Sequence, residues 1–180
     1  DETPRADAAY EKLAKLRTVY PDGVCTAGNS SSENDGAAAV VLMSAEKAKE
    51  LGAPLLARFV SGANAACDPT LTYPAVGTAT EKSLAKAGLS VEQIDLFEIQ
   101  EAFAVQMLAD AKIMHIAKDD YDRKINVNGS GISLGHPIGA TGVMRLTTLL
   151  HEMRRSNAAW GLETICGGGG QGIAAIFQGA

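Results

Sequence analysis

Two short stretches of the sequence carry residue types that can do acid–base chemistry. The first, SLGHPIGATG at residues 133–142, holds His136 between a glycine and a proline. Proline disfavours the α region for the residue before it, so we expect an extended backbone at His136 that fixes the direction of the ring. An imidazole titrates near neutral pH and can accept and return a proton. His136 is therefore a candidate general base, with a purely structural histidine as the alternative.

The second stretch, CGGGGQG, begins at Cys166 and continues as a run of glycines. Glycines let a ligand approach the backbone closely, and their N–H groups can bind a developing oxyanion. Gly167, Gly169 and Gly172 formally match GxGxxG, but a dinucleotide site needs a helix after the glycines, and the following IAAIF is typical of a strand. Taken alone, Cys166 is also compatible with a small buried residue, and the glycines with tight turns.

The surrounding pattern predicts an α/β fold with a mixed sheet, parallel where helices intervene and antiparallel in a C-terminal hairpin. The run AAAVVLM at 37–43 is typical of a strand buried on both faces. Ser44 and Gly52 mark the start and end of a short helix. Further strands are expected at 55–62, 94–99, 162–166 and 172–178, and further helices at 6–16, 77–88, 102–116 and around the apolar stripe Val143, Leu146, Leu150 and Met153.

Three unusual strings lie where a predicted strand gives way to a loop or turn. They are EIQEAFA at 98–104, NGSGISLGHPIGATG at 128–142 and CGGGGQG at 166–172. Open α/β sheets gather functional groups at such strand ends. We therefore expect the three strings to form one site.

Composition excludes several classes of function. The chain has 180 residues and a net charge of −5, so it offers no basic field for nucleic acid. Its three cysteines are widely spaced, which disfavours both a disulfide framework and paired zinc ligands. No apolar run approaches the roughly 20 residues that cross a bilayer, and the start shows no signal-peptide pattern. We expect a single-domain cytoplasmic protein that binds neither nucleic acid nor membranes.

The three strings, in this order, resemble the C-terminal half of the thiolases, the acyl-CoA acyltransferases that cleave or form 3-ketoacyl-CoA thioesters. TAGNSSSENDGAAAVVLMS at 26–44 and GLETICGGGGQG at 161–172 extend the resemblance to almost the whole chain. It implies one thiolase C-terminal-like domain over residues 1–180, with 1–24 as a lead-in segment from the loop region. The implied fold is a mixed five-stranded sheet with helices on both faces.

The resemblance also implies roles for individual residues. In the family, the GHP histidine activates a nucleophilic cysteine and helps to hold the thioester oxygen, and the cysteine before the glycines moves a proton; His136 and Cys166 match these two. Gly168 matches the residue whose backbone N–H contacts the acyl-enzyme oxygen. Ser31 is similar to a serine that contacts the pantetheine arm of coenzyme A, and Ala102 and Phe103 resemble pocket-lining residues.

Two departures from the family pattern are visible. Gln100 stands where the family usually has asparagine or histidine holding an ordered water, so the position of that water is in doubt. The nucleophilic cysteine belongs to the N-terminal half of thiolases, and neither Cys25 nor Cys67 has the surroundings of an activated thiol. The resemblance therefore implies an acyltransferase half that is inactive without an N-terminal half.

The implied ligand is a coenzyme A thioester, bound as a substrate, with no permanent cofactor and no metal. The implied partner is an N-terminal thiolase half or subunit, with dimers or tetramers of the assembled units. A non-catalytic subunit that keeps the fold is the alternative, with Gln100 as a sign of lost chemistry. The decarboxylating condensing enzymes of the same superfamily commonly replace the second cysteine by histidine, so Cys166 disfavours that branch.

Overall fold

A mixed sheet of four strands forms the centre of the computed structural model, which describes residues 3–71 and 73–180. The strands run across the sheet in the order β1 (Ala57–Ala66), β4 (Gln171–Gly179), β3 (Trp160–Gly167) and β2 (Leu96–Ile99). β4 is antiparallel to both β1 and β3, whereas β2 and β3 are parallel. The carboxyl ends of β2 and β3 therefore lie at the same edge of the sheet.

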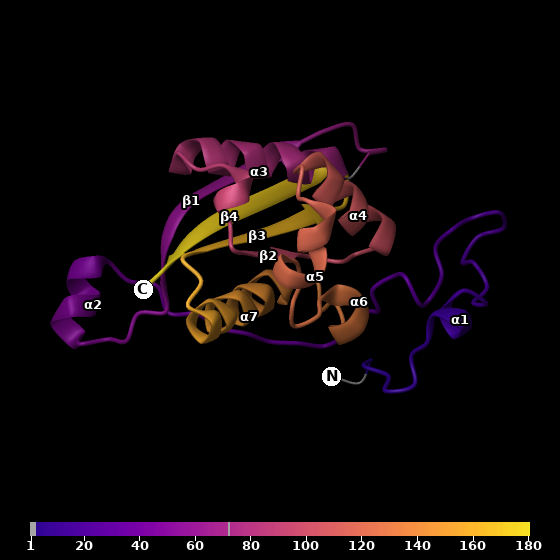
Figure 1. Cartoon of the computed structure of the whole chain (residues 1–180), viewed down its shortest axis with the longest axis horizontal. Coiled ribbons are helices and arrows are strands. Elements are labelled where there is room, and N and C mark those ends of the chain that lie inside the picture. Colours follow the sequence, from indigo (N-terminus) through magenta and orange to yellow (C-terminus); the bar gives the residue numbers. More distant parts are fainter. Residues whose placement is uncertain (1–2, 72) are drawn as a thin grey trace.

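Helices cover both faces of the sheet, as the sequence predicts (Figure 1). α3 (Tyr73–Ala87) and α4 (Ala104–Ile113) lie on one face, and α7 (Thr141–Ser156) lies on the other. Each face has its own apolar cluster, because alternate side chains of a strand point to opposite sides. The α3/α4 side contains Leu84, Phe97, Ile99, Ala111, Leu162 and Ile176; the α7 side contains Leu96, Leu149, Met153 and Phe177.

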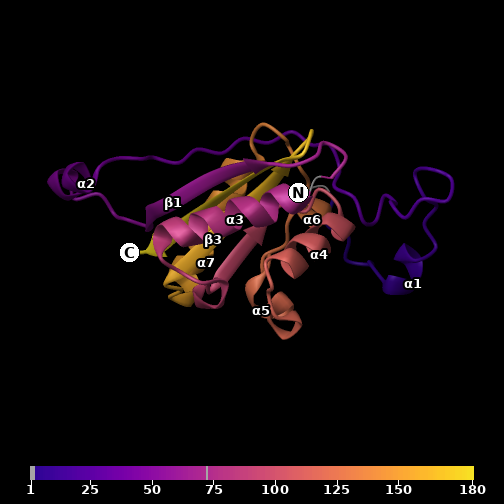
Figure 2. The same cartoon turned by 90° about the horizontal axis from the view of Figure 1, so that it is seen from above.

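The other helices are short, and two of them lie at opposite ends of the chain's long axis (Figure 2). α1 (Tyr10–Leu13) and α2 (Ala45–Leu51) lie outside the sheet, and α5 (Tyr121–Lys124) and α6 (Gly131–Leu134) belong to the connection before α7. The predicted ends of α2 are confirmed. Ser44 Oγ accepts a hydrogen bond from Lys47 N, and Gly52 is left-handed with φ 60°.

The predicted fifth strand, residues 37–43, is wrong for this chain. The segment has no strand partner, and most of it is exposed, with Val41 at 83% and Leu42 at 81%. A strand needs a neighbour to satisfy its N–H and C=O groups, and apolar composition cannot supply one. At the β2 edge of the sheet, Ile125 forms an isolated parallel bridge with Phe97.

Several helix bounds also differ from the sequence-based expectation. The predicted helix at 6–16 is limited to Tyr10–Leu13, and that at 102–116 to Ala104–Ile113, while α3 begins at Tyr73, before the expected residue 77. The predicted C-terminal hairpin is confirmed as β3 and β4, joined by a turn in which Gly169 and Gly170 have φ of 84° and 79°. Within the described residues no helix is long and apolar enough to cross a bilayer.

Candidate active site at the carboxyl edge of β2 and β3

His136 lies in the loop between α6 and α7, and its ring is oriented by the first residue of α7. His136 Nδ1 is 2.7 Å from Thr141 Oγ1, and the Thr141 hydroxyl donates its proton to Pro137 O at 2.9 Å. A hydroxyl has one proton, so Nδ1–H must donate to Thr141 and the Nε2 lone pair stays available. Burial, aided by the Arg145 charge, lowers the pKa of His136. At neutral pH His136 is therefore an uncharged proton acceptor at Nε2.

The backbone of His136 is fixed by the polar segment at residues 29–34. His136 N donates to Asn34 Oδ1 at 3.0 Å and to Ser32 O at 3.2 Å. Gly135 has φ 96°, and a β-carbon on it would lie 2.5 Å from Asn34 Oδ1, so only glycine permits this approach. The direction of the histidine thus depends on a segment about a hundred residues earlier in the chain.

The same segment contacts the residues that follow β2. Ser31 N donates to Ala102 O at 2.9 Å, and Ser30 and Phe103 form an isolated antiparallel bridge. Phe103 remains 44% exposed. The structure therefore brings together the three residues expected to bind substrate, Ser31, Ala102 and Phe103, and joins them to His136 through one continuous segment. Their roles in binding stay predictions.

Gln100 is fully buried directly after β2. Its backbone N donates to Thr164 O at 3.0 Å, which continues the pairing of β2 with β3. Neither atom of its side-chain amide has a hydrogen-bond partner among the described residues. A buried polar group without a partner costs about 1–3 kcal/mol. The hydrogen-bonding groups of this amide are therefore unused within the described residues.

Cys166 is the second-to-last residue of β3 and pairs with Gly172 of β4. Burial, together with the Asp110 carboxyl, raises the pKa of its thiol to about 11. The thiol is therefore protonated at neutral pH, which suits a proton donor better than a resting nucleophile. Cys166 lines an open cavity of about 630 Å³ that also includes Gly167, Gln171 and residues 64–66 of β1.

Cys166 lies near the carboxyl end of β3, and His136 lies in the loop before α7. No hydrogen bond joins their side chains among the residues that the structure describes. Strand alternation turns Cys166, with Leu162 and Thr164, toward α3 and α4, whereas Ile165 faces α7. Gly142 of α7 is close to β3, since a β-carbon there would lie 3.6 Å from Ile165 Cδ1. The Cys166 side chain thus belongs to the α3/α4 side of β3.

Gly168 lies exposed in the turn between β3 and β4. A β-carbon on it would meet no atom within 4 Å, and Gln171 Nε2 donates to its carbonyl oxygen at 3.1 Å. A ligand can therefore reach this part of the backbone. The oxyanion role expected for its N–H stays a prediction.

Sequence reasoning missed the buried charges behind the site. Glu98 of β2 and Glu163 of β3 lie in register on neighbouring strands, and Arg145 of α7 is their nearest cation; they are 2%, 9% and 2% exposed. Burial raises the pKa of each carboxyl to about 8. The available signal was a glutamate within each of the apolar runs IDLFEI and GLETIC. Charged residues are almost never fully buried without a partner, so a glutamate in a predicted core strand indicates a buried cation nearby.

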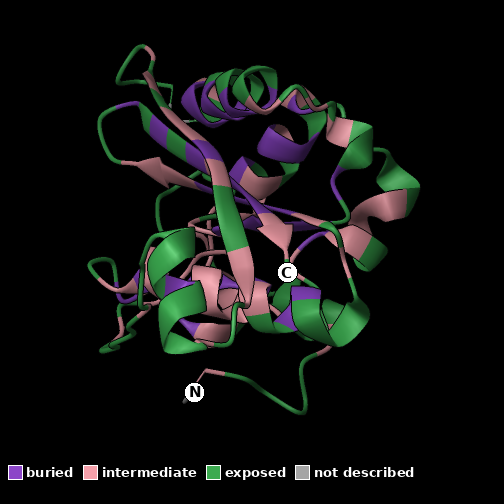
Figure 3. Cartoon of the chain, turned by 90° about the vertical axis from the view of Figure 1, so that its left-hand side faces the viewer, coloured by how far each residue is buried: buried purple, intermediate pink, exposed green. Residues whose placement is uncertain are grey.

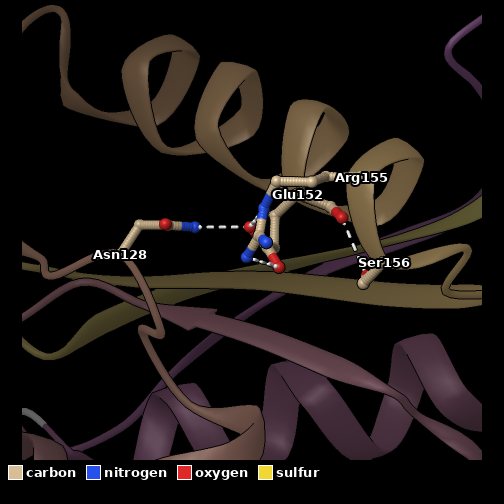
Figure 4. A network of polar contacts seen from close by, with 4 residues as sticks. All are labelled: Asn128, Glu152, Arg155 and Ser156. Atoms are coloured by element: carbon tan, nitrogen blue, oxygen red, sulfur yellow. Dashed lines mark hydrogen bonds and ion pairs between the residues drawn. The ribbon is translucent and has the colours of Figure 1, made fainter.

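A second polar network holds the loop before α6 against α7 (Figure 4). Glu152 accepts hydrogen bonds from Asn128 Nδ2 at 3.0 Å and from Arg155 Nε at 2.9 Å, and its backbone oxygen accepts one from Ser156 Oγ. Buried residues gather in the central strands and on the sides of the helices that pack on them (Figure 3). The network around Glu152 stabilises the loop that leads to His136. Among residues 3–71 and 73–180, no cluster of three or more His, Cys, Asp or Glu side chains is placed to bind a metal.

The fold and this edge site define the class of the chain: it belongs to the thiolase family. The sequence model of the thiolase C-terminal domain matches residues 53–179, and that of the thiolase N-terminal domain matches residues 1–46. The second match contains the segment 37–43.

Individual relatives are similar over nearly the whole chain. An acetyl-CoA acetyltransferase of Pseudomonas aeruginosa is 54% identical over 176 residues, which is 97% of this chain and 44% of that protein. A 3-ketoacyl-CoA thiolase of Vibrio vulnificus is 45% identical over 180 residues, or 99% of this chain and 46% of that protein. The chain thus spans less than half the length of these relatives.

Two solved structures have the same fold. The Bacillus anthracis acetyl-CoA acetyltransferase matches with a TM-score of 0.95 and 45% identity, over 100% of this chain and 45% of that one. Human mitochondrial 3-ketoacyl-CoA thiolase in complex with CoA matches with a TM-score of 0.91 and 38% identity, again over 100% and 45%. These matches support the α/β thiolase fold, with four strands in place of the expected five.

Proposed function

We propose that this chain is the C-terminal part of a thiolase that transfers acyl groups between coenzyme A and a 3-ketoacyl-CoA, by thiolytic cleavage or Claisen condensation. An N-terminal polypeptide supplies the nucleophilic cysteine, and the coenzyme A thioester is a substrate. Membership of the thiolase family and the CoA complex of the human relative support this reaction class. A cytoplasmic location and assembly into dimers or tetramers belong to the same proposal.

The proton acceptor in this proposal is Nε2 of His136. It takes the proton of the partner's thiol, and the thiolate attacks the 3-keto carbon of the substrate. The bond between Cα and the 3-keto carbon breaks, the acyl group stays on the partner's sulfur, and the enolate of the shortened thioester takes a proton from the Cys166 thiol. Coenzyme A then gives its thiol proton to the Cys166 thiolate and attacks the acyl carbonyl, and the partner's cysteine leaves as a thiolate that takes its proton back from His136. The raised pKa of Cys166 fits a group that is protonated before the bond breaks.

The remaining site residues bind oxygen atoms or the substrate arm. The N–H of Gly168 contacts the acyl oxygen, and the free amide of Gln100 contacts the enolate oxygen directly or through water. Ser31 contacts the pantetheine arm, and Ala102 and Phe103 line the substrate pocket. The observation that carries the proposal is the segment at 29–34, because it hydrogen-bonds Ala102 on one side and His136 on the other.

The partner in this proposal also explains the exposed segment at 37–43. Its apolar residues lie within the part matched by the N-terminal domain family, and they lack any strand neighbour. We infer that this segment completes a sheet of the N-terminal polypeptide. The inference accounts for the exposure of Val41 and Leu42 without any rearrangement of β1 to β4.

The test is reconstitution. The chain is co-expressed with the N-terminal part of the Pseudomonas aeruginosa relative, and thiolysis of acetoacetyl-CoA and of longer 3-ketoacyl-CoA thioesters is measured. The proposal expects turnover that Cys166→Ala and His136→Ala each reduce by at least about a hundredfold. An assembled pair that cleaves none of these thioesters would contradict it.

A non-catalytic subunit is the second candidate, and Gln100 favours it. Gln100 departs from the family pattern, and its amide has no partner among the described residues. Replacement of Gln100 by asparagine separates the two candidates: it restores turnover to an inert pair if lost chemistry is the cause, and changes an active pair only modestly.

A further inference from the structure

Arg145 of α7 is a buried cation that no carboxylate neutralises directly. It is 2% exposed, and its Nε has no hydrogen-bond partner among the described residues. The carboxyls of Glu98 and Glu163 are near enough to feel its charge, but within residues 3–71 and 73–180 neither forms an ion pair with it. Burial raises the pKa of both carboxyls to about 8, so both are largely protonated at neutral pH. The guanidinium therefore keeps its positive charge inside the fold.

Stability alone does not account for an arginine at this position. The guanidinium donates to Gly129 O at 3.1 Å through Nη1. Removal of an ion from water costs more than a hydrogen bond to one carbonyl returns, and an uncharged side chain of similar length would avoid that cost. The reason for the charge is therefore to be sought in the groups on which it acts.

Arg145 lies one helical turn after Thr141, on the same buried side of α7. Residues four apart on a helix are neighbours, with about 5–6 Å between their β-carbons. Thr141 and Arg145 are 1% and 2% exposed, and the Thr141 hydroxyl is the group that holds Nδ1 of His136. Burial is the first cause of the lowered pKa of His136, and the charge of Arg145 is the second. The guanidinium is thus close enough to act on the imidazole.

Arg145 also holds one end of the loop that carries His136. The loop is bound to α7 at Gly129, through the hydrogen bond from Arg145, and at Pro137, whose carbonyl accepts a hydrogen bond from the Thr141 hydroxyl at 2.9 Å. Both contacts come from the same side of one helix. The position of His136 between them therefore depends on Arg145 as well as on Thr141.

The other charged groups around His136 act on it more weakly. Glu33 forms an isolated parallel bridge with His136 through its backbone, but the side chains of Glu33 and Asp35 are exposed. Water and salt screen exposed charges. Glu98 and Glu163, on the strands beneath α7, are protonated in the range below pH 7 where His136 titrates. Among the described residues, Arg145 is therefore the main charge that acts on the imidazole.

We propose that Arg145 is a positioning residue for the proton transfers of His136: it holds the loop at Gly129 and keeps the imidazole uncharged between transfers. This inference rests on the proposed function in taking His136 as the proton acceptor. An uncharged imidazole offers its Nε2 lone pair to the partner's thiol. When the partner's cysteine later leaves as a thiolate, the guanidinium disfavours the imidazolium and so favours return of the proton to that sulfur.

The first test is a pH titration of His136 by NMR in the isolated chain, with the signal assigned by its loss in His136→Gln. Arg145→Met removes the charge and fills similar space, so the pKa of His136 should rise. Arg145→Gln removes the charge but keeps a donor for Gly129 O, and it should give a rise in the same direction, so the test does not depend on one neutral variant folding. Arg145→Lys keeps the charge and should restore the parent value. Arg154→Met, at an exposed position of the same helix, is the control and should change nothing.

The second test uses the pair reconstituted with the N-terminal part of the Pseudomonas aeruginosa relative. In Arg145→Met the acid limb of the pH profile of kcat/KM should move to higher pH, with a loss of about threefold or more at pH 6 and a smaller loss at pH 8. A loss of the same size at every pH would show a merely structural role and overturn the proposal.

Two results in the isolated chain would also overturn it: an unchanged pKa of His136 in both neutral variants, or a pKa in Arg145→Lys equal to that in Arg145→Met. A pair that cleaves no thioester, with His136 titrating as expected in the isolated variants, would support the action of Arg145 on His136 and contradict the proposed function.

Discussion

Gly131 packs directly on Gln100 at the carboxyl edge of β2. A β-carbon on Gly131 would lie 2.3 Å from Gln100 Nε2 and 2.5 Å from the backbone oxygen of Glu101. The first residue of α6 therefore contacts the segment after β2 with no room for a side chain. This contact joins the loop that leads to His136 to the strand edge, and it limits where the free amide of Gln100 can point.

Gly131→Ala should destabilise the chain by about 1–3 kcal/mol, because the new methyl must displace backbone as well as a buried side chain. Urea unfolding followed by circular dichroism measures the loss. Gly139→Ala is the matched control, since Gly139 is exposed in the neighbouring loop and its β-carbon would meet no atom within 4 Å. Equal free energies of unfolding for the two variants would show that the contact does not constrain the site.

Local signals in the sequence predicted the elements whose ends are chemically marked. Ser44 and Gly52 bound α2 as expected, and Ser90 with Gln93 forms a capping box before β2. These features depend on neighbours within a few residues, so they are visible in the sequence. The hairpin of β3 and β4 was predictable for the same reason, because glycines with positive φ join two apolar runs.

Features that depend on distant or absent partners were not predictable from pattern. Residues 37–43 have the composition of a buried strand, but their exposure depends on a sheet that this chain lacks. The contacts of Ser31 with Ala102 and of Asn34 with His136 join residues far apart in sequence. The resemblance to thiolases indicated which residues to compare, but only the structure shows that one segment contacts both Ala102 and His136.

Thr141 should determine which nitrogen of His136 carries the proton. Thr141→Val removes the acceptor of Nδ1–H, so the ring should become a mixture of tautomers with less free Nε2. Thr141→Ser keeps the hydroxyl and should preserve the parent tautomer. Nitrogen-15 NMR of the histidine side chains reports the tautomer directly in the isolated chain. In the reconstituted pair, Thr141→Val should lower kcat by about tenfold or more. An unchanged tautomer in Thr141→Val would show that other contacts orient the ring.

The buried carboxyls should make the chain less stable as the pH rises above neutrality. Burial raises the pKa of Glu98 and Glu163 to about 8 and that of Asp110 to about 7. The folded chain therefore keeps these protons at a pH where the unfolded chain has lost them. Their contribution to the free energy of unfolding decreases as the pH rises from the unfolded pKa values, near 4, to about 8. Exposed carboxyls with lowered pKa values, such as Glu92, are ionised in both states above pH 6 and do not oppose the trend.

The melting temperature should accordingly be on the order of 5 °C lower at pH 8.5 than at pH 6.5, given about 2–4 °C per kcal/mol for a domain of this size. Glu98→Gln and Asp110→Asn should each flatten the profile, because an amide cannot ionise. Scanning calorimetry over this pH range makes the measurement. Glu81→Gln changes an exposed carboxyl on α3 and is the control. It should leave the slope of melting temperature against pH unchanged. A melting temperature that rises with pH in the parent would show that the carboxyls are ionised and paired in the folded chain.

Cys166 should react slowly with alkylating reagents at neutral pH, because only the thiolate reacts and burial raises the pKa of this thiol to about 11. Its rate of alkylation should continue to rise up to about pH 10. Asp110 lies on α4, the side toward which Cys166 points, and its charge contributes to the rise. Asp110→Asn should therefore lower the pKa of the thiol and speed its alkylation at pH 8.5 by a factor of about two to ten. Glu98→Gln, which changes a carboxyl on the α7 side, should leave the rate unchanged. Iodoacetamide labelling followed by mass spectrometry of the peptide that contains Cys166 gives both rates. A labelling rate that levels off below pH 9 in the parent would show a populated thiolate, and would assign Cys166 a nucleophile's properties in place of a proton donor's.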